Sequence, residues 1–232
     1  MKIFLNGEWQ NLNKKNEVLN PFDGSVIDTI PSASPAEITA AIDGLAKGAE
    51  TMRQLPSYKR VEILRKTGNL IREQKEEISQ LISSEEGKVL AESRIETSRA
   101  AETIDLSADE ARRMHGETLP LDSTPGGVGK IGFSLRVPCG IVAAITPFNF
   151  PLNLVAHKLG PAIAGGNAIL LKPASDTPLS SLKLVELFLY IIRGLLHSYK
   201  AVLDQFMGGM FLVRIGGLIE KHTTKPLKQL VL

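Results

Sequence analysis

The chain has 232 residues, of which 43% are hydrophobic and 22% are charged, a balance that argues against a disordered protein. The formal net charge of +2 is too small to indicate a nucleic-acid partner. The only cysteine, Cys139, excludes an intramolecular disulfide, and no uncharged apolar run reaches the roughly 20 residues of a membrane span. With no secretory signal at the amino terminus, we expect a cytoplasmic protein that binds no membrane.

The first thirty residues predict turns and short strands. Asn6-Gly7 lies between apolar residues and indicates a β-hairpin, because a type I′ turn needs positive φ at both central positions. A second turn is expected over residues 20–24, where Asn, Pro, Asp and Gly gather, and a short strand over 25–30.

The next ninety residues predict helices. Ser34 can cap a helix, Pro35 suits its first position, and Glu37 completes a capping box. Helical periodicity resumes after Pro56, and residues 92–114 are typical of one more long helix with a charged side. We expect the charges of these helices to form solvated faces.

The pattern changes beyond a Gly- and Pro-rich loop over residues 120–132, which is a candidate domain boundary. Residues 140–145 form an apolar run without alternation, as expected of a parallel strand covered on both faces. A helix is expected over 151–164, a second strand over 168–171, and another helix from Thr177. This order predicts an α/β fold with a parallel sheet.

Ligands of open parallel sheets bind beyond the carboxyl ends of the strands, where two loops of this chain are expected. Prolines stiffen the loop over residues 146–151, in which Asn149 offers an amide N–H₂ to a developing oxyanion. Lys172 follows the second strand and could hold ribose hydroxyls or phosphate. Spacing alone leaves the alternatives open that Asn149 is a turn residue and Lys172 a solvated one.

A long string of residues resembles the aldehyde dehydrogenase superfamily, and the resemblance covers about residues 1–189. It is carried by Asn6-Gly7-Glu8-Trp9, Glu85-Glu86-Gly87-Lys88, Val137-Pro138-Cys139-Gly140, Ile145-Thr146-Pro147-Phe148-Asn149-Phe150-Pro151, Ala164-Gly165-Gly166-Asn167 and Leu171-Lys172-Pro173-Ala174-Ser175. The resemblance implies an α/β fold with an incomplete Rossmann-like parallel sheet, preceded by a β-hairpin and helices.

The same resemblance divides residues 1–189 into three parts. Residues 1–120 would form the hairpin and helices of the cofactor domain, and residues 140–189 a βαβα cofactor-binding unit. Between them, residues 121–139 resemble the family's oligomerisation flap, with a strand over 131–137, which implies a possible homo-oligomer.

The resemblance also implies roles for single residues. Asn149 matches the asparagine that stabilises the thiohemiacetal oxyanion, and Lys172 the lysine that binds the adenosine ribose. Ser175 falls where NAD-preferring members often have Glu, so a 2′-phosphate would not be repelled and NADP would be tolerated beside NAD. The residues expected to line the cofactor's path are Ile145, Thr146, Pro147 and Phe148. No metal is expected.

The resemblance is lost after Leu189, and residues 190–232 form a divergent tail with no strand that we could assign. The family's nucleophilic Cys, its deacylating Glu and its second cofactor loop are not found, and Cys139 is expected to be a small buried hydrophobe. Oxidation of an aldehyde to a carboxylic acid with NAD(P) is therefore not expected of this chain alone. The alternatives are a non-catalytic nucleotide-binding or interaction fragment and the product of a frameshifted gene.

Overall fold

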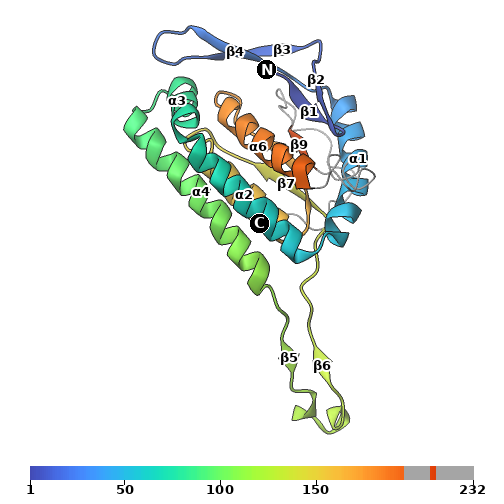
Figure 1. Cartoon of the computed structure of the whole chain (residues 1–232). Helices are drawn as coiled ribbons and strands as arrows, with labels where there is room; N and C mark the ends of the chain where they lie inside the picture. The colour runs from blue at the N-terminus through green and yellow to red at the C-terminus, as the bar shows by residue number, and fades with distance from the viewer. Residues whose placement is uncertain (196–209, 213–232) are drawn as a thin grey trace.

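The computed structural model describes residues 1–195 in full and the backbone of residues 210–212. Helices form most of the body, a small parallel sheet lies beside them, and a long hairpin arm projects from one end (Figure 1). The predicted divergence over 190–232 falls largely on residues 196–209 and 213–232, which lie outside the described residues.

Two antiparallel hairpins open the chain. They pair β1 (Ile3–Leu5) with β2 (Glu8–Gln10), and β3 (Lys15–Leu19) with β4 (Val26–Pro31). Asn6 and Gly7 have φ values of 50° and 85°, the two positive angles that a type I′ turn requires. The predicted first hairpin is therefore confirmed.

Four helices follow: α1 (Pro35–Gln54), α2 (Ser57–Glu73), α3 (Lys75–Glu86) and α4 (Leu90–Arg113). The predicted capping box is present, since Ser34 Oγ accepts from the Glu37 amide at 3.3 Å and the Glu37 carboxylate accepts from the Ser34 amide at 2.7 Å. Helix α2 packs along α4, and α3 packs against the start of α4.

The sheet consists of parallel strands in the order β7–β8–β9. Its elements are β7 (Ile141–Ile145), α5 (Asn153–Ala164), β8 (Ala168–Lys172), α6 (Leu179–Leu195) and β9 (Met210–Leu212). The predicted βαβα order is confirmed and with it a partial Rossmann-like α/β fold. Strand β9 lies in the tail to which the sequence assigned no strand.

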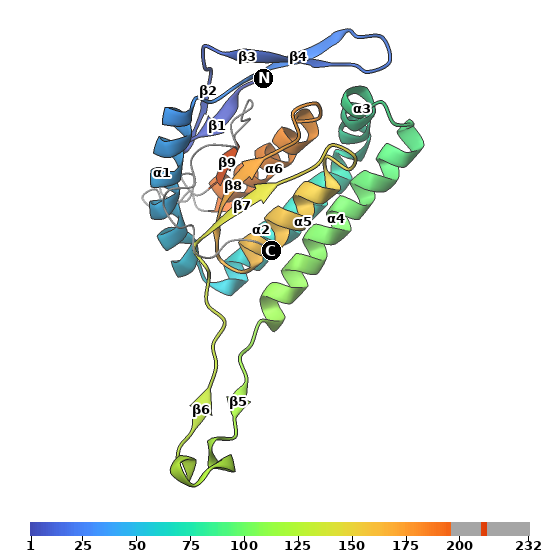
Figure 2. The ribbon, with the colours of Figure 1, turned by 180° about the vertical axis from the view of Figure 1, so that it is seen from behind.

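Helix α5 joins the sheet to the helical layer, since it contacts β7 and β8 and packs on α4 and α2 (Figure 2). A side chain at Gly160 of α5 would place its Cβ 2.4 Å from Ser107 Oγ of α4. The close packing of these two helices therefore needs a glycine at this position.

The expectation that the first parallel strand is covered on both faces is wrong. In β7, Ala144 is fully buried, whereas Ala143 is exposed and Ile145 is 58% exposed. Among the described residues β7 pairs with β8 alone, and the Ala143 and Ile145 side chains on its second face are left uncovered.

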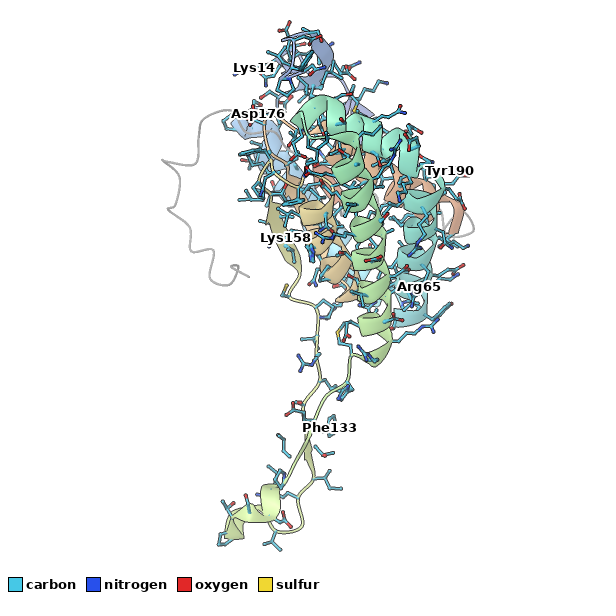
Figure 3. The ribbon with its side chains drawn as sticks, turned by 90° about the vertical axis from the view of Figure 1, so that its left-hand side faces the viewer. Lys14, Arg65, Phe133, Lys158, Asp176 and Tyr190 are labelled. Atoms are coloured by element: carbon cyan, nitrogen blue, oxygen red, sulfur yellow. The ribbon has the colours of Figure 1, made fainter. Side chains whose placement is uncertain are left out.

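The arm carries β5 (Thr118–Leu119), two short 3₁₀ helices (Leu121–Ser123 and Pro125–Gly127) and β6 (Gly132–Phe133). The predicted strand over 131–137 is thus shortened to two residues, because β6 pairs only with the two-residue β5. Phe133 lies on this arm, away from the body (Figure 3).

None of the helices within the described part of the chain combines the length and the apolar character that a membrane crossing requires.

Candidate functional site

The loops that carry Asn149 and Lys172 leave the sheet side by side. Strands β7 and β8 are parallel, and Ile145 is in register with Lys172. The backbone ladder continues beyond the strands, since the Thr146 amide donates to the Lys172 carbonyl at 3.2 Å. In addition, Thr177 Oγ1 donates to the Phe148 carbonyl at 3.4 Å. Both loops therefore lie at one edge of the sheet, where ligands of such folds bind.

The predicted cofactor-lining residues form a largely exposed apolar strip at this edge. Ile145 and Phe148 are each 58% exposed, and Pro147 is exposed as well. Thr146 is buried between them, and its hydroxyl has no hydrogen-bond partner among the described residues. Exposed apolar surface of this kind is typical of a face that binds a ligand or a partner.

The predicted polar residues are accessible at the same edge. Asn149 is exposed, and Lys172 is half-buried, with its Nζ donating to the Pro173 carbonyl at 3.2 Å. Ser175 is half-buried in the loop after β8, and its neighbour Asp176 lies at the end of the body where α3 lies (Figure 3). These positions place the Lys172 ammonium and the Ser175 hydroxyl near the strand ends.

The loop before α5 is held by a buried glutamate of α4. Glu96 Oε1 accepts from the amides of Leu152 and Asn153 at 2.9 and 3.1 Å. The amino end of α5 has no capping side chain of its own, so Glu96 satisfies its free amides and places a negative charge at the positive end of the helix dipole. Only 1% of the Glu96 side chain is exposed.

A second buried glutamate holds the start of α6 in the same way. The Glu85 carboxylate accepts from the amides of Leu179 and Ser180 at 2.6 and 2.9 Å. Burial raises the pKa of Glu85 to about 7, against the lowering effect of these hydrogen bonds. The sequence predicted the start of this helix at Thr177. The Thr177 hydroxyl donates to the Phe148 carbonyl.

Lys88 links Glu96 and Glu86 to the loop that carries Asn149. Its Nζ lies 2.8 Å from Glu96 Oε2 and 2.9 Å from Glu86 Oε1, and donates to the Asn149 carbonyl at 3.1 Å. The ammonium also lies over the Phe150 ring, 4.3 Å from its centroid. The turn between α3 and α4 thus contacts the candidate site directly.

The expectation that the helix charges form solvated faces is therefore wrong for Glu85 and Glu96. Both glutamates lie on helices whose charge pattern suits a solvated face, but the starts of α5 and α6 cover them. The signal that could have found them is indirect. Leu152, the N-cap of α5, cannot cap a helix, so a partner from elsewhere in the chain is required.

The expectation that Cys139 is buried is also wrong. Cys139 is exposed, and its Sγ donates to Asn167 Oδ1 at 3.2 Å. It precedes β7, whereas Asn149 follows it. A five-residue strand at ~3.3 Å per residue separates these ends by roughly 16 Å. Cys139 and Asn149 therefore lie at opposite edges of the sheet.

His157 is exposed on α5. No group of three His, Cys, Asp or Glu side chains within residues 1–195 is arranged to hold a metal ion.

Comparison with known proteins gives one consistent family. The model described as "Aldehyde dehydrogenase family" matches residues 9–192. A 3-sulfolactaldehyde dehydrogenase of Priestia aryabhattai is 44% identical over 186 residues, which cover 80% of this chain and 38% of that protein. A lactaldehyde dehydrogenase of Methanocaldococcus jannaschii is 39% identical over 204 residues, which cover 88% of this chain and 42% of that protein.

Solved structures agree with the sequence comparison. An NADP-dependent glyceraldehyde-3-phosphate dehydrogenase of Bacillus halodurans, complexed with NADP, superposes with a TM-score of 0.83 at 34% identity over 94% of this chain and 44% of its own. An aldehyde dehydrogenase of Physcomitrella patens, in complex with its reaction product succinate, superposes with a TM-score of 0.84 at 33% identity over 93% and 43%. The chain thus spans less than half the length of these relatives.

Proposed function

This chain belongs to the aldehyde dehydrogenase family, and from that premise we propose that it binds NADP or NAD at the carboxyl ends of β7 and β8. The observation that carries the proposal is the register of Ile145 with Lys172. It joins the apolar strip and the lysine at one edge of the sheet, the place where doubly wound folds bind dinucleotides.

The residues at this edge have distinct tasks in the proposal. The Lys172 ammonium donates to hydroxyls of the adenosine ribose, and the strip from Ile145 to Phe148 lies along the cofactor. Ser175 carries no charge that would repel a 2′-phosphate, so NADP is accepted beside NAD. The relative from Bacillus halodurans was solved with NADP, which supports this choice.

Asn149 is proposed as the oxyanion-stabilising residue of the family's reaction, the oxidation of an aldehyde to a carboxylic acid. Its amide N–H₂ would donate to the aldehyde oxygen once a thiolate has added to the carbonyl carbon. A bound nicotinamide would supply the hydride acceptor. The residues of this chain would orient that ring and hold the negative charge on the oxygen.

The nucleophile is the part of this chemistry that we propose this chain does not supply. The sequence contains one cysteine, Cys139, and it lies at the opposite edge of the sheet from Asn149. A thiolate there cannot reach a carbonyl carbon whose oxygen is bound to Asn149. We therefore expect cofactor binding by this chain without aldehyde oxidation.

The test is calorimetric titration of the purified chain with NADP and with NAD. Binding is expected, and Lys172→Ala should raise the dissociation constant roughly tenfold or more, because charge-assisted hydrogen bonds are lost. Lys158→Ala, on α5, is the matched control and should bind as the unchanged chain does. Absence of binding to either dinucleotide would overturn the proposal.

The same sample should form no reduced nicotinamide when lactaldehyde or succinate semialdehyde is added, as followed by absorbance. A turnover of about 1 s⁻¹ or more, within the ordinary range of enzymes, would show that this chain contains a nucleophile that we have missed.

We also propose that the arm mediates assembly with a second copy of this chain. Ile131, Leu135 and Val137 are 91%, 72% and 77% exposed, an unusual amount of apolar surface for one short segment. Ile131→Glu combined with Val137→Glu should convert an oligomer into a monomer in sedimentation velocity. A chain that is already monomeric before substitution would refute this.

A further inference from the structure

The loop between β7 and α5 is fixed through its carbonyl groups. Thr177 holds the Phe148 carbonyl, the Leu154 amide donates to the Phe150 carbonyl at 3.0 Å, and Ser181 Oγ donates to the Pro151 carbonyl at 3.0 Å. Lys88 is the group that holds the carbonyl of Asn149 itself. The four carbonyls from Phe148 to Pro151 therefore each have their own anchor, and that of Asn149 comes from a distant part of the chain.

Lys88 is confined to this position by its surroundings. Only 11% of its side chain is exposed, and two carboxylates, those of Glu86 and Glu96, lie within 3 Å of its ammonium. Glu96 in turn binds the amides at the start of α5. The Lys88–Glu96 ion pair thus binds the loop at two points. Lys88 binds the Asn149 carbonyl before Pro151, and Glu96 binds the two amides after it.

We propose that Lys88, oriented by Glu96, is a positioning residue that fixes the backbone of Asn149 and Phe150 and so presents the Asn149 amide at the edge of the sheet. This inference rests on the proposed function of that edge. Pro147 and Pro151 restrict the ends of the loop, and Pro151 also limits Phe150, but neither proline restricts ψ of Asn149, about which the Asn149–Phe150 peptide can still turn. Without the ammonium, that carbonyl exchanges its partner for water and the peptide can rotate.

Backbone order is the direct readout. The ¹⁵N order parameters of Asn149 and Phe150, measured without cofactor, should be near ~0.85, the value of rigid backbone. In Lys88→Met/Glu96→Gln both should fall below ~0.6, as in flexible loops. The double substitution removes both charges of the Lys88–Glu96 pair and leaves only Glu86 without its cation, and the Gln oxygen can still accept from the amides at the start of α5.

Two variants separate positioning from general stability. Lys88→Arg keeps a cation that can bridge Glu96 and the Asn149 carbonyl, so the order parameters of Asn149 and Phe150 should stay as in the unchanged chain. Lys66→Met removes an exposed lysine of α2 and should change none of them. Unchanged order at Asn149 and Phe150 in the double variant overturns the proposal, and so does an equal loss of order at Ile169 and Leu170 of β8.

Titration with NADP then tests the consequence for the site. The dissociation constant of the double variant should rise roughly tenfold, because NADP must then order a loop that the Lys88 hydrogen bond no longer holds in place. If the unchanged chain binds no NADP, the proposed function fails, while the order parameters still decide whether Lys88 positions the loop.

Discussion

Replacing Glu96 with alanine is expected to lower the free energy of unfolding by about 3–5 kcal/mol, the usual cost of removing one partner of a buried ion pair. The substitution deletes the partner of Lys88 and leaves two amides at the start of α5 without an acceptor. Urea unfolding followed by circular dichroism measures the change.

Glu102→Ala is the matched control, since Glu102 lies on the same helix but is exposed. Its effect should stay within about 0.5 kcal/mol, as for most surface substitutions. A loss below about 1 kcal/mol for Glu96→Ala would contradict the view that Glu96 holds the start of α5. It would mean that water replaces the carboxylate without difficulty.

A second large effect concerns pH and Glu85. Burial raises the pKa of Glu85 from 4.5 to about 7, so between these values the folded chain holds a proton that the unfolded chain has lost. The stabilisation from this proton is complete below pH 4.5 and is lost as the pH rises through about 7. The expected loss is roughly 3 kcal/mol.

The measurement compares the unchanged chain with Glu85→Gln by urea unfolding between about pH 5 and about pH 8. Glutamine does not titrate, so the difference in stability between the two chains should change by roughly 3 kcal/mol across this range. Burial also raises the pKa of the neighbouring Glu86, and taking the difference removes that contribution. A difference that stays constant with pH would show that Glu85 does not titrate in this range.

The candidate site was only partly predictable from the sequence, because some of its contacts join residues that are far apart in the chain. The sequence indicated that two strand ends would bring the loops of Asn149 and Lys172 to one edge, and the register of β7 with β8 bears this out. It gave no indication that Lys88 holds the Asn149 carbonyl, a contact across 61 positions of the chain. It also failed for Cys139, because an apolar neighbourhood in sequence does not reveal that the entry to β7 lies at the surface.

What the sequence determined by itself was local. The Asn6-Gly7 turn, the capping box from Ser34 to Glu37 and the alternation of strands with helices after residue 140 depend on interactions between near neighbours. Backbone sterics and side-chain periodicity act within a few residues, so the pattern alone was sufficient.

Only the tertiary structure decided which charges are buried. Glu85 and Glu96 have the spacing of solvated helix residues, but each meets a helix start more than fifty positions later in the chain. A helix start without a capping side chain needs an acceptor from outside, and the identity of that acceptor depends on how the helices pack. Packing is a property of the whole fold, and no local pattern encodes it.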